Sequence, residues 1–315
     1  MRHLFSYSVY QELEKLSPDL HPRLDGIGCD GIELLTSHDP VDPVYLKDAV
    51  SVHLPYSTDW IAAWEDRAYE MSDFYAKYYM YGKNRDKVIS TVRNMIDVAA
   101  PLRPAHGVIH ASNIGLPYLH RRQYPGDCRQ VLRTFCEMIN TVVSSFPGGE
   151  PPFKLAFENL WWPGLRLLDD SDFRLIQKHI EFENWGICLD TGHLMNTIPG
   201  IRTEQDGIDA LLKIFDGYST DLIDSIGAMH FHYSASGDYR ASFEEREYEG
   251  GPITEFISGV YHHISQLDQH LPFSDGRCRE LVEYISPELV IHELPGHGHD
   301  PLVDFAQQRR LLNGL

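Results

Sequence analysis

The chain alternates short apolar runs with longer segments whose apolar residues recur every three or four positions. The short runs predict β-strands and the longer segments predict amphipathic helices, because side chains repeat every two residues along a strand and about every 3.6 along a helix. We expect strands at residues 3–9, 31–36, 49–55, 107–111, 153–159, 186–190, 227–232 and 289–294. We expect helices at residues 83–100, 128–144, 170–179, 207–215, 253–270, 277–285 and 301–312.

The order of these elements favours a parallel sheet, because a strand, a helix and a second strand form the unit from which such sheets are built. Eight strands in 315 residues predict an α/β fold of the (β/α)8 (TIM) barrel type, in a single domain over residues 1–315. A doubly wound open sheet is the competing interpretation. It is disfavoured because no G-x-G-x-x-G motif follows an early strand.

Two segments are longer than ordinary connections between elements. Residues 56–82 form an insert rich in Trp, Tyr and Phe, and residues 234–252 form a long loop rich in Ser, Gly, Glu and Arg. Both segments follow predicted strands. In a barrel they would therefore lie at the C-terminal face, where active sites form.

Composition narrows the class of ligand. The formal net charge is −19, and Lys and Arg are scattered along the chain. A nucleic-acid-binding protein usually carries a basic stripe, so we expect a small-molecule substrate rather than nucleic acid. The sequence leaves the oligomeric state open.

We expect a cytoplasmic protein with no membrane segment. The first residues, MRHLFSYSVY, lack the apolar core and small-residue cleavage site of a signal peptide, and no apolar run approaches the roughly 18 residues of a membrane helix. The five cysteines form no C-x-x-C pair, which indicates neither a disulfide framework nor a zinc ribbon.

Imidazole and carboxylate side chains stand where the predicted strands end. These residues are His53, His110, Glu158, Asp190 with His193 behind it, His230 with His232, and Glu293. A parallel barrel brings such ends onto one rim, and burying several carboxylates together is costly unless cations neutralise them. Mixed histidine and carboxylate ligands suit zinc, manganese or iron, so the pattern predicts a divalent-metal site.

Five short motifs carry a resemblance to a known superfamily. They are VHLPY at residues 52–56, FENL at 157–160, LDTGHL at 189–194, MHFHYS at 229–234 and HELP at 292–295. Their order and spacing resemble the xylose isomerase-like TIM barrels, which include endonuclease IV (AP endonuclease family 2) and the sugar epimerases. The resemblance runs over nearly the whole chain.

The resemblance implies a set of metal ligands. One ion would be held by Glu158, Asp190, His230 and Glu293. A second ion would use His53 and His110, with Glu158 bridging the two ions, a pattern that resembles endonuclease IV more than the epimerases.

The resemblance also bears on a third ion. In endonuclease IV it is bound by the histidine of the D-x-x-H motif, here His193, and by an Asp-x-His after strand seven. No Asp-x-His occurs in residues 234–252, and Asp238, Glu245 or His232 are the candidate substitutes. Alternatively, His193 contacts substrate, as it would in an epimerase.

The aromatic insert bears on the substrate. Trp60, Trp64, Trp161 and Trp162 are candidates to hold a large flat ligand, although packing between helices would also explain the rings of the insert. Arg121 and Arg240, on loops after strands, are candidates to face a phosphate, although solvated surface positions would also explain them.

Two functions follow from the resemblance and these residues. The first is a metal-dependent hydrolase of a phosphodiester-bearing small molecule, in which Glu158, Glu293 and His193 are catalytic. One branch of the superfamily, the cobamide-remodelling hydrolases, cleaves the nucleotide loop of vitamin B12-like cofactors, and the aromatic insert would fit such a bulky, flat substrate. The alternative is a sugar or polyol isomerase or epimerase, in which one metal and a Glu158/Glu293 acid–base pair move a proton.

Overall fold

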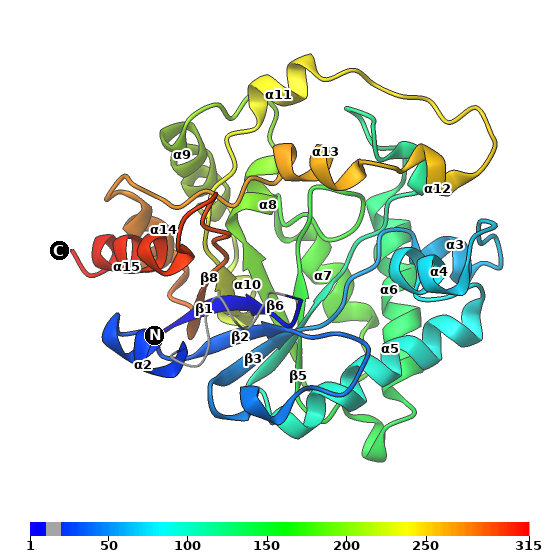
Figure 1. Ribbon diagram of the computed structural model, residues 1–315, viewed down its shortest axis with the longest axis horizontal. Coiled ribbons are helices and arrows are strands. Elements are labelled where there is room, and N and C mark those ends of the chain that lie inside the picture. The colour runs from blue at the N-terminus through cyan, green and yellow to red at the C-terminus, as the bar shows by residue number, and fades with distance from the viewer. Residues whose placement is uncertain (11–19, 315) are drawn as a thin grey trace.

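In the computed structural model, which describes residues 1–10 and 20–314, eight parallel strands close into a barrel (Figure 1). The strands are β1 (Arg2–Ser8), β2 (Ile32–Leu35), β3 (Ala49–His53), β4 (His106–His110), β5 (Lys154–Glu158), β6 (Trp185–Asp190), β7 (Ile226–His230) and β8 (Leu289–His292). Each strand pairs with its neighbours in chain order, and β8 also pairs with β1. The predicted (β/α)8 fold is confirmed.

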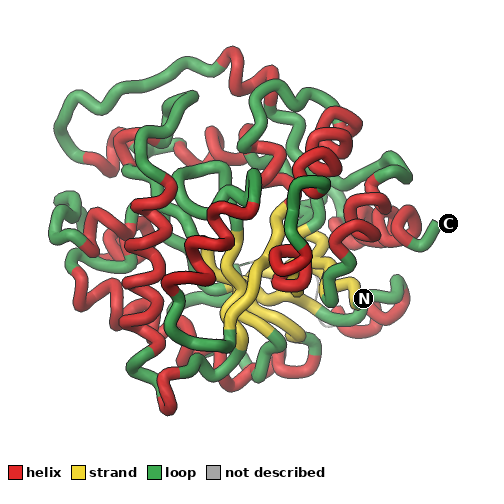
Figure 2. The backbone as a smooth tube through the Cα atoms, turned by 180° about the vertical axis from the view of Figure 1, so that it is seen from behind, coloured by secondary structure: helices red, strands yellow, loops and turns green. Residues whose placement is uncertain are grey.

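Helices surround the barrel (Figure 2). They are α2 (Leu20–Gly26), α3 (Trp60–Trp64), α4 (Asp73–Met80), α5 (Arg85–Ala99), α6 (Cys128–Val143), α7 (Asp170–His179), α8 (Thr191–Asn196), α9 (Glu204–Phe215), α10 (Thr220–Ser225), α11 (Gly237–Ser242), α12 (Ile253–Phe256), α13 (Val260–Leu267), α14 (Cys278–Ile285) and α15 (Pro301–Leu312). Short 3-10 turns lie at Pro43–Lys47, Ala100–Leu102, Leu116–Tyr118 and Pro147–Gly149. None of the helices in the described part of the chain is long and apolar enough to span a bilayer.

The prediction of one helix over residues 253–270 is wrong. The segment is divided into α12 and α13, and Gly259 between them has a φ of 79°, which an α-helix does not accommodate. Helix α13 then ends at Leu267, and residues 268–270 leave it as a loop. The apolar residues keep their helical spacing across both breaks, so the sequence pattern alone does not reveal where the helices end.

The interior of the barrel is layered. A small apolar cluster occupies it, made of Leu4, Val108, Ala156, Cys188, Ala228, Leu289 and Ile291. Side chains two residues apart on a strand point to the same side, so residue i + 2 lies in the next layer toward the carboxyl end. Those positions hold His110 after Val108, Glu158 after Ala156, Asp190 after Cys188 and His230 after Ala228. The alternation of the strands therefore places polar groups in one layer above an apolar one.

The aromatic insert packs against the barrel through α3. Trp60 and Trp64 are almost completely buried, and the Trp60 indole N–H donates to the carbonyl of Ser112 at 2.8 Å. The carboxylate of Asp59 accepts hydrogen bonds from Asn113 Nδ2 at 3.0 Å and from the backbone N–H of Leu116 at 3.1 Å. These contacts fasten the insert to the loop after β4.

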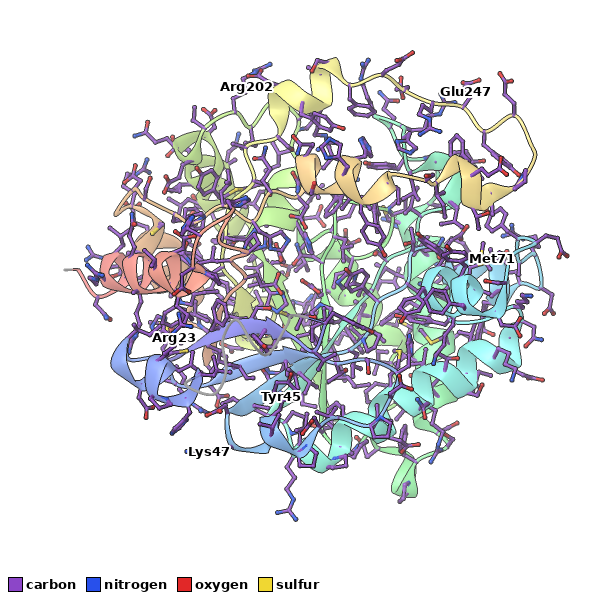
Figure 3. The ribbon with its side chains drawn as sticks, in the orientation of Figure 1. Arg23, Tyr45, Lys47, Met71, Arg202 and Glu247 are labelled. Carbon is purple, nitrogen blue, oxygen red and sulfur yellow. The ribbon has the colours of Figure 1, made fainter. Side chains whose placement is uncertain are left out.

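Residues 243–251, here called the strap, join α11 to α12 along the upper edge of the molecule, where Glu247 lies (Figure 3). Arg121 forms a 2.7 Å ion pair with Glu247, and the backbone N–H of Arg122 donates to Glu245 Oε1 at 2.9 Å. The strap is therefore held to the loop that follows β4.

Replacing Trp60 by Ala should lower the free energy of unfolding by about 3–5 kcal/mol, because a fully buried ring and its hydrogen bond are lost. Tyr75, on α4 of the same insert, is 46% exposed and serves as the matched control. Tyr75→Ala should change the free energy of unfolding by no more than about 0.5 kcal/mol. Urea denaturation followed by circular dichroism measures both, and equal losses would contradict the assignment of Trp60 to the core.

Candidate metal centre

The Glu158 carboxylate, at the end of β5, lies between three histidines. Its Oε2 lies 3.1 Å from His53 Nε2 and 3.0 Å from His110 Nε2, and its Oε1 lies 2.8 Å from His230 Nδ1. The carboxylate is 1% exposed. The ends of β3, β4, β5 and β7 thus bring together four of the six predicted metal ligands.

A second group of candidate ligands surrounds the Nδ1 atom of His230. Besides Glu158 at 2.8 Å, Asp190 Oδ2 and Glu293 Oε1 each lie 3.6 Å from this nitrogen. One imidazole nitrogen facing three carboxylates suits a shared divalent cation, because such an ion accepts nitrogen and oxygen ligands together. The structure therefore brings together the four residues that the resemblance implies for the first ion.

A third group contains two residues that the sequence analysis missed. His193 Nε2 lies 3.2 Å from Asp268 Oδ2, and His270 Nε2 lies 2.8 Å from the same oxygen. Asp268 and His270 stand in the loop after α13, within the stretch predicted to be helical. They form the Asp-x-His pattern that was sought only in residues 234–252, so the spacing was present in the sequence as Asp-Gln-His.

Asp238, proposed from the sequence as a third-site residue, lies outside this centre. It is an exposed side chain on α11 that forms an ion pair with Arg202. The prediction failed because it took the nearest carboxylate after strand seven, whereas the chain crosses α11, the strap, α12 and α13 before it returns to the barrel rim (Figure 1).

The D-x-x-H motif has a local structural explanation. Asp190 is the N-cap of α8: its Oδ1 accepts a 2.6 Å hydrogen bond from the backbone N–H of His193. This cap leaves Asp190 Oδ2 directed toward His230. Asn159, next to Glu158, donates to the Asp190 carbonyl at 3.0 Å and accepts from the Asp190 N–H at 2.8 Å. The asparagine of the FENL motif therefore fixes the backbone that carries Asp190.

His232 lies at the side of the centre, fully buried. Its Nε2 lies 3.0 Å from Asp190 Oδ2, and its ring stacks on His270 with centroids 4.0 Å apart. The ring also fills the space beside Gly192, where an added Cβ would lie 2.2 Å from His232 Cε1. Glycine is thus required at that position of the D-T-G-H sequence for as long as residue 232 is histidine.

Electrostatics explain how so many carboxylates can be buried together. Burial alone would raise the pKa of Glu158, but His230 and His110 hold the pKa well below its usual range. Burial would lower the pKa of His193, but Asp190 and Asp268 hold it well above its ordinary value. Asp268 likewise raises the pKa of His270 to about 9 against the effect of burial. Positive charge is therefore required here, and either protons or divalent cations can supply it.

A cavity of about 1150 Å³ opens above these groups. Its floor includes His53, Glu158 and His193, and its walls include Trp161 and Trp162. Further rings around it belong to Tyr10, Tyr56, Tyr78, Tyr79 and Tyr261. Among the described residues, no Lys or Arg lines the cavity.

Four of the residues proposed from the sequence to contact substrate do not line this cavity. Trp60 and Trp64 are in the apolar core, so the packing explanation holds for them. Arg121 is paired with Glu247 of the strap, and Arg240 donates to the Asn196 carbonyl. Aromatic and cationic residue types alone could not distinguish rings and charges used in packing from those that face a ligand.

Comparisons with known proteins agree with this architecture. No protein-family model and no curated protein matches the chain. Among solved structures, endonuclease IV from Thermus thermophilus matches with a TM-score of 0.55 at 12% identity over 100% of both chains. The chain shares the (β/α)8 barrel fold of this enzyme.

Two other solved structures support the same fold. A D-tagatose 3-epimerase-like protein matches with a TM-score of 0.53 at 16% identity, over 100% of this chain and 96% of that one. A xylose isomerase domain protein from Planctomyces limnophilus matches with a TM-score of 0.52 at 12% identity, over 99% and 96%. Since these barrels include both a nuclease and an epimerase-like protein, the activity has to be inferred from the site itself.

Zinc binding should release protons. Without metal the pKa values of His193, His230 and His270 are raised, so these rings carry protons at neutral pH that a metal ion must displace. Zinc affinity should consequently increase as the pH rises from about 6 to about 9. Titration calorimetry at pH 7 in buffers with different ionisation enthalpies measures the protons released, and heats that do not depend on the buffer would contradict this expectation.

Proposed function

We propose that this protein is a divalent-metal-dependent hydrolase that acts on a phosphodiester-bearing small molecule. The observation that carries the proposal is the position of Glu158, whose two oxygens face two different groups of ligands. One group is His53 with His110, and the other contains His230. A carboxylate so placed suits a pair of ions bridged by one residue.

Bound zinc, manganese or iron would supply water activation at neutral pH and stabilisation of the oxygens around phosphorus. The residues of the chain have separate tasks. Glu158 would bridge two ions, while Glu293, 15% exposed and on the cavity wall, would face the reacting group. His193, on the cavity floor beside Asp268 and His270, would hold a third ion or contact the phosphate directly.

The scarcity of cationic side chains in the cavity lining supports a substrate that carries little negative charge. With neither Lys nor Arg in the described lining, metal ions and protonated histidines are the cations there that would meet a phosphate. A nucleic acid presents one phosphate after another and is usually bound by Lys and Arg, so this cavity suits a molecule with a single phosphodiester on an otherwise uncharged body. The net charge of −19 points in the same direction.

The finer proposal is cleavage of the nucleotide loop of a cobamide. Such a cofactor joins a bulky, flat corrin to its lower ligand through one phosphodiester. The large cavity is lined by aromatic residues, among them Trp161, Trp162, Tyr56 and Tyr261, which supports a bulky, flat ligand. Metal-loaded protein incubated with a cobamide should release the lower ligand, a change visible in the absorbance spectrum. An unchanged spectrum together with no binding would exclude this substrate.

An isomerase or epimerase is the second candidate. The grouping of Glu158, Asp190, His230 and Glu293 around one nitrogen favours it, because one ion in that group would leave Glu158 and Glu293 to exchange a proton with a sugar carbonyl. In that case His53 and His110 would hold no metal. Metal content therefore distinguishes the two candidates: about two or three ions per chain support the hydrolase, and one ion supports the epimerase.

Glu158→Gln should weaken two metal sites together and reduce activity by about 100-fold or more, whereas His53→Ala should weaken one site. Mass spectrometry of protein purified without chelator or affinity nickel gives the metal content per chain. Glu247→Gln, which removes an exposed carboxylate on the strap, is the matched control and should leave metal content unchanged. A Glu158→Gln variant with full metal content would show that Glu158 does not bridge two ions.

A further inference from the structure

Glu33 is a carboxylate beneath the metal centre that the sequence analysis did not identify. It lies on β2, between Ile32 and Leu34, and its side chain points into the barrel with 0% exposure. We propose that Glu33 is a positioning residue, which orients the His230 ring so that Nδ1 is free to bind metal. The proposal rests on the metal centre proposed above, and it concerns how that centre is held rather than what it hydrolyses.

The two nitrogens of His230 face opposite groups of carboxylates. Nε2 lies 2.7 Å from Glu33 Oε1, while Nδ1 faces Glu158, Asp190 and Glu293. A hydrogen bond from Nε2–H to Glu33 fixes the proton on that nitrogen and leaves the Nδ1 lone pair directed at the centre. Metal-binding histidines generally donate their second N–H to a carboxylate, carbonyl or water in this way.

Glu33 is itself held firmly by groups outside the metal centre. Its Oε2 accepts a hydrogen bond from Ser51 Oγ at 2.8 Å and lies 3.1 Å from His106 Nε2. Ser51 belongs to β3 and His106 to β4, and both are buried. Both carboxylate oxygens are therefore engaged, so Glu33 can maintain one orientation of the His230 ring.

The alternative is that Glu33 is a metal ligand. The 2.7 Å between Glu33 Oε1 and His230 Nε2 is the length of a charge-assisted hydrogen bond. The other Glu33 oxygen is already engaged by Ser51 and His106, whereas the three other carboxylates face the Nδ1 atom of His230. The ion that His230 binds belongs on the Nδ1 side of the ring, away from Glu33.

Two variants of Glu33 separate these roles. Glu33→Ala removes the acceptor and should weaken zinc binding at the His230 group about 10–100-fold. Glu33→Gln keeps an oxygen that can accept from Nε2–H and should restore most of the affinity. Competition between the protein and a chromogenic chelator for zinc measures each affinity without any substrate. The visible spectrum of cobalt-loaded protein, which reports the geometry around the ion, should change in the Ala variant and be close to wild type in the Gln variant.

Glu204→Ala is the matched control, because Glu204 also accepts several hydrogen bonds, from the backbone N–H groups of Ser274 and Asp275, but lies outside the centre. It should bind zinc as the wild type does. If Glu33→Ala also bound zinc with wild-type affinity, the positioning role would be overturned. If Glu33→Gln lost as much affinity as Glu33→Ala, the hydrogen bond would not be the cause, which overturns the role as well.

The wild-type titration keeps this inference distinct from the proposed function. Wild-type protein that bound no zinc would overturn both the metal centre and the role of Glu33. Wild-type protein that bound zinc, together with an unaffected Glu33→Ala variant, would overturn the role of Glu33 alone. Should Glu33→Ala fail to fold, the Gln variant and its cobalt spectrum still decide the question, because loss of affinity in a folded Gln variant contradicts the proposal.

Discussion

The burial of carboxylates inside one end of the barrel is the constraint on which this structure depends. Glu158 and Asp190 are almost wholly enclosed, and Asp268 retains only 9% exposure. Such groups cannot remain charged in a barrel interior without nearby positive charge. Histidines from β3, β4 and β7, and from the segments after β6 and α13, supply that charge or share it with a cation. The polar rim is therefore a single electrostatic unit.

The barrel supports this unit through the regularity of its strands. Because side chains two residues apart share a side, an apolar layer of Val108, Ala156, Cys188 and Ala228 lies directly below the ligand layer. The apolar layer is buried on one side of these groups, and the cavity opens on the other. This arrangement is interrupted on β2, β3 and β4, where polar groups continue from His230 toward the opposite end of the barrel. These groups are Glu33, Ser51 and His106, respectively.

The regular parts of the structure were predictable from the sequence, because short apolar runs mark the strands and parallel strands place their ends on one rim. The parts that could not be predicted depend on where loops and inserted segments come back to the rim of the barrel. Asp268 and His270 continue the apolar spacing of α13, and only the end of that helix places them at the rim. From the sequence alone, Trp60 could either contact a ligand or pack in the core, and its burial decides for the core. The inward direction of Glu33 was readable from the alternation, but its partner His230 was not, because their contact spans most of the chain.

The contact between Gly192 and His232 affects how this sequence can diverge. The ring occupies the volume that any side chain at position 192 would need, with only 2.2 Å to an added Cβ. Neither position can therefore change alone to a larger residue. A lineage that acquired even alanine at 192 would first have to replace His232 by something smaller, and would lose the stacking partner of His270. Changes at position 192 should therefore occur only in sequences where residue 232 has already become smaller, so the order of the two substitutions is fixed.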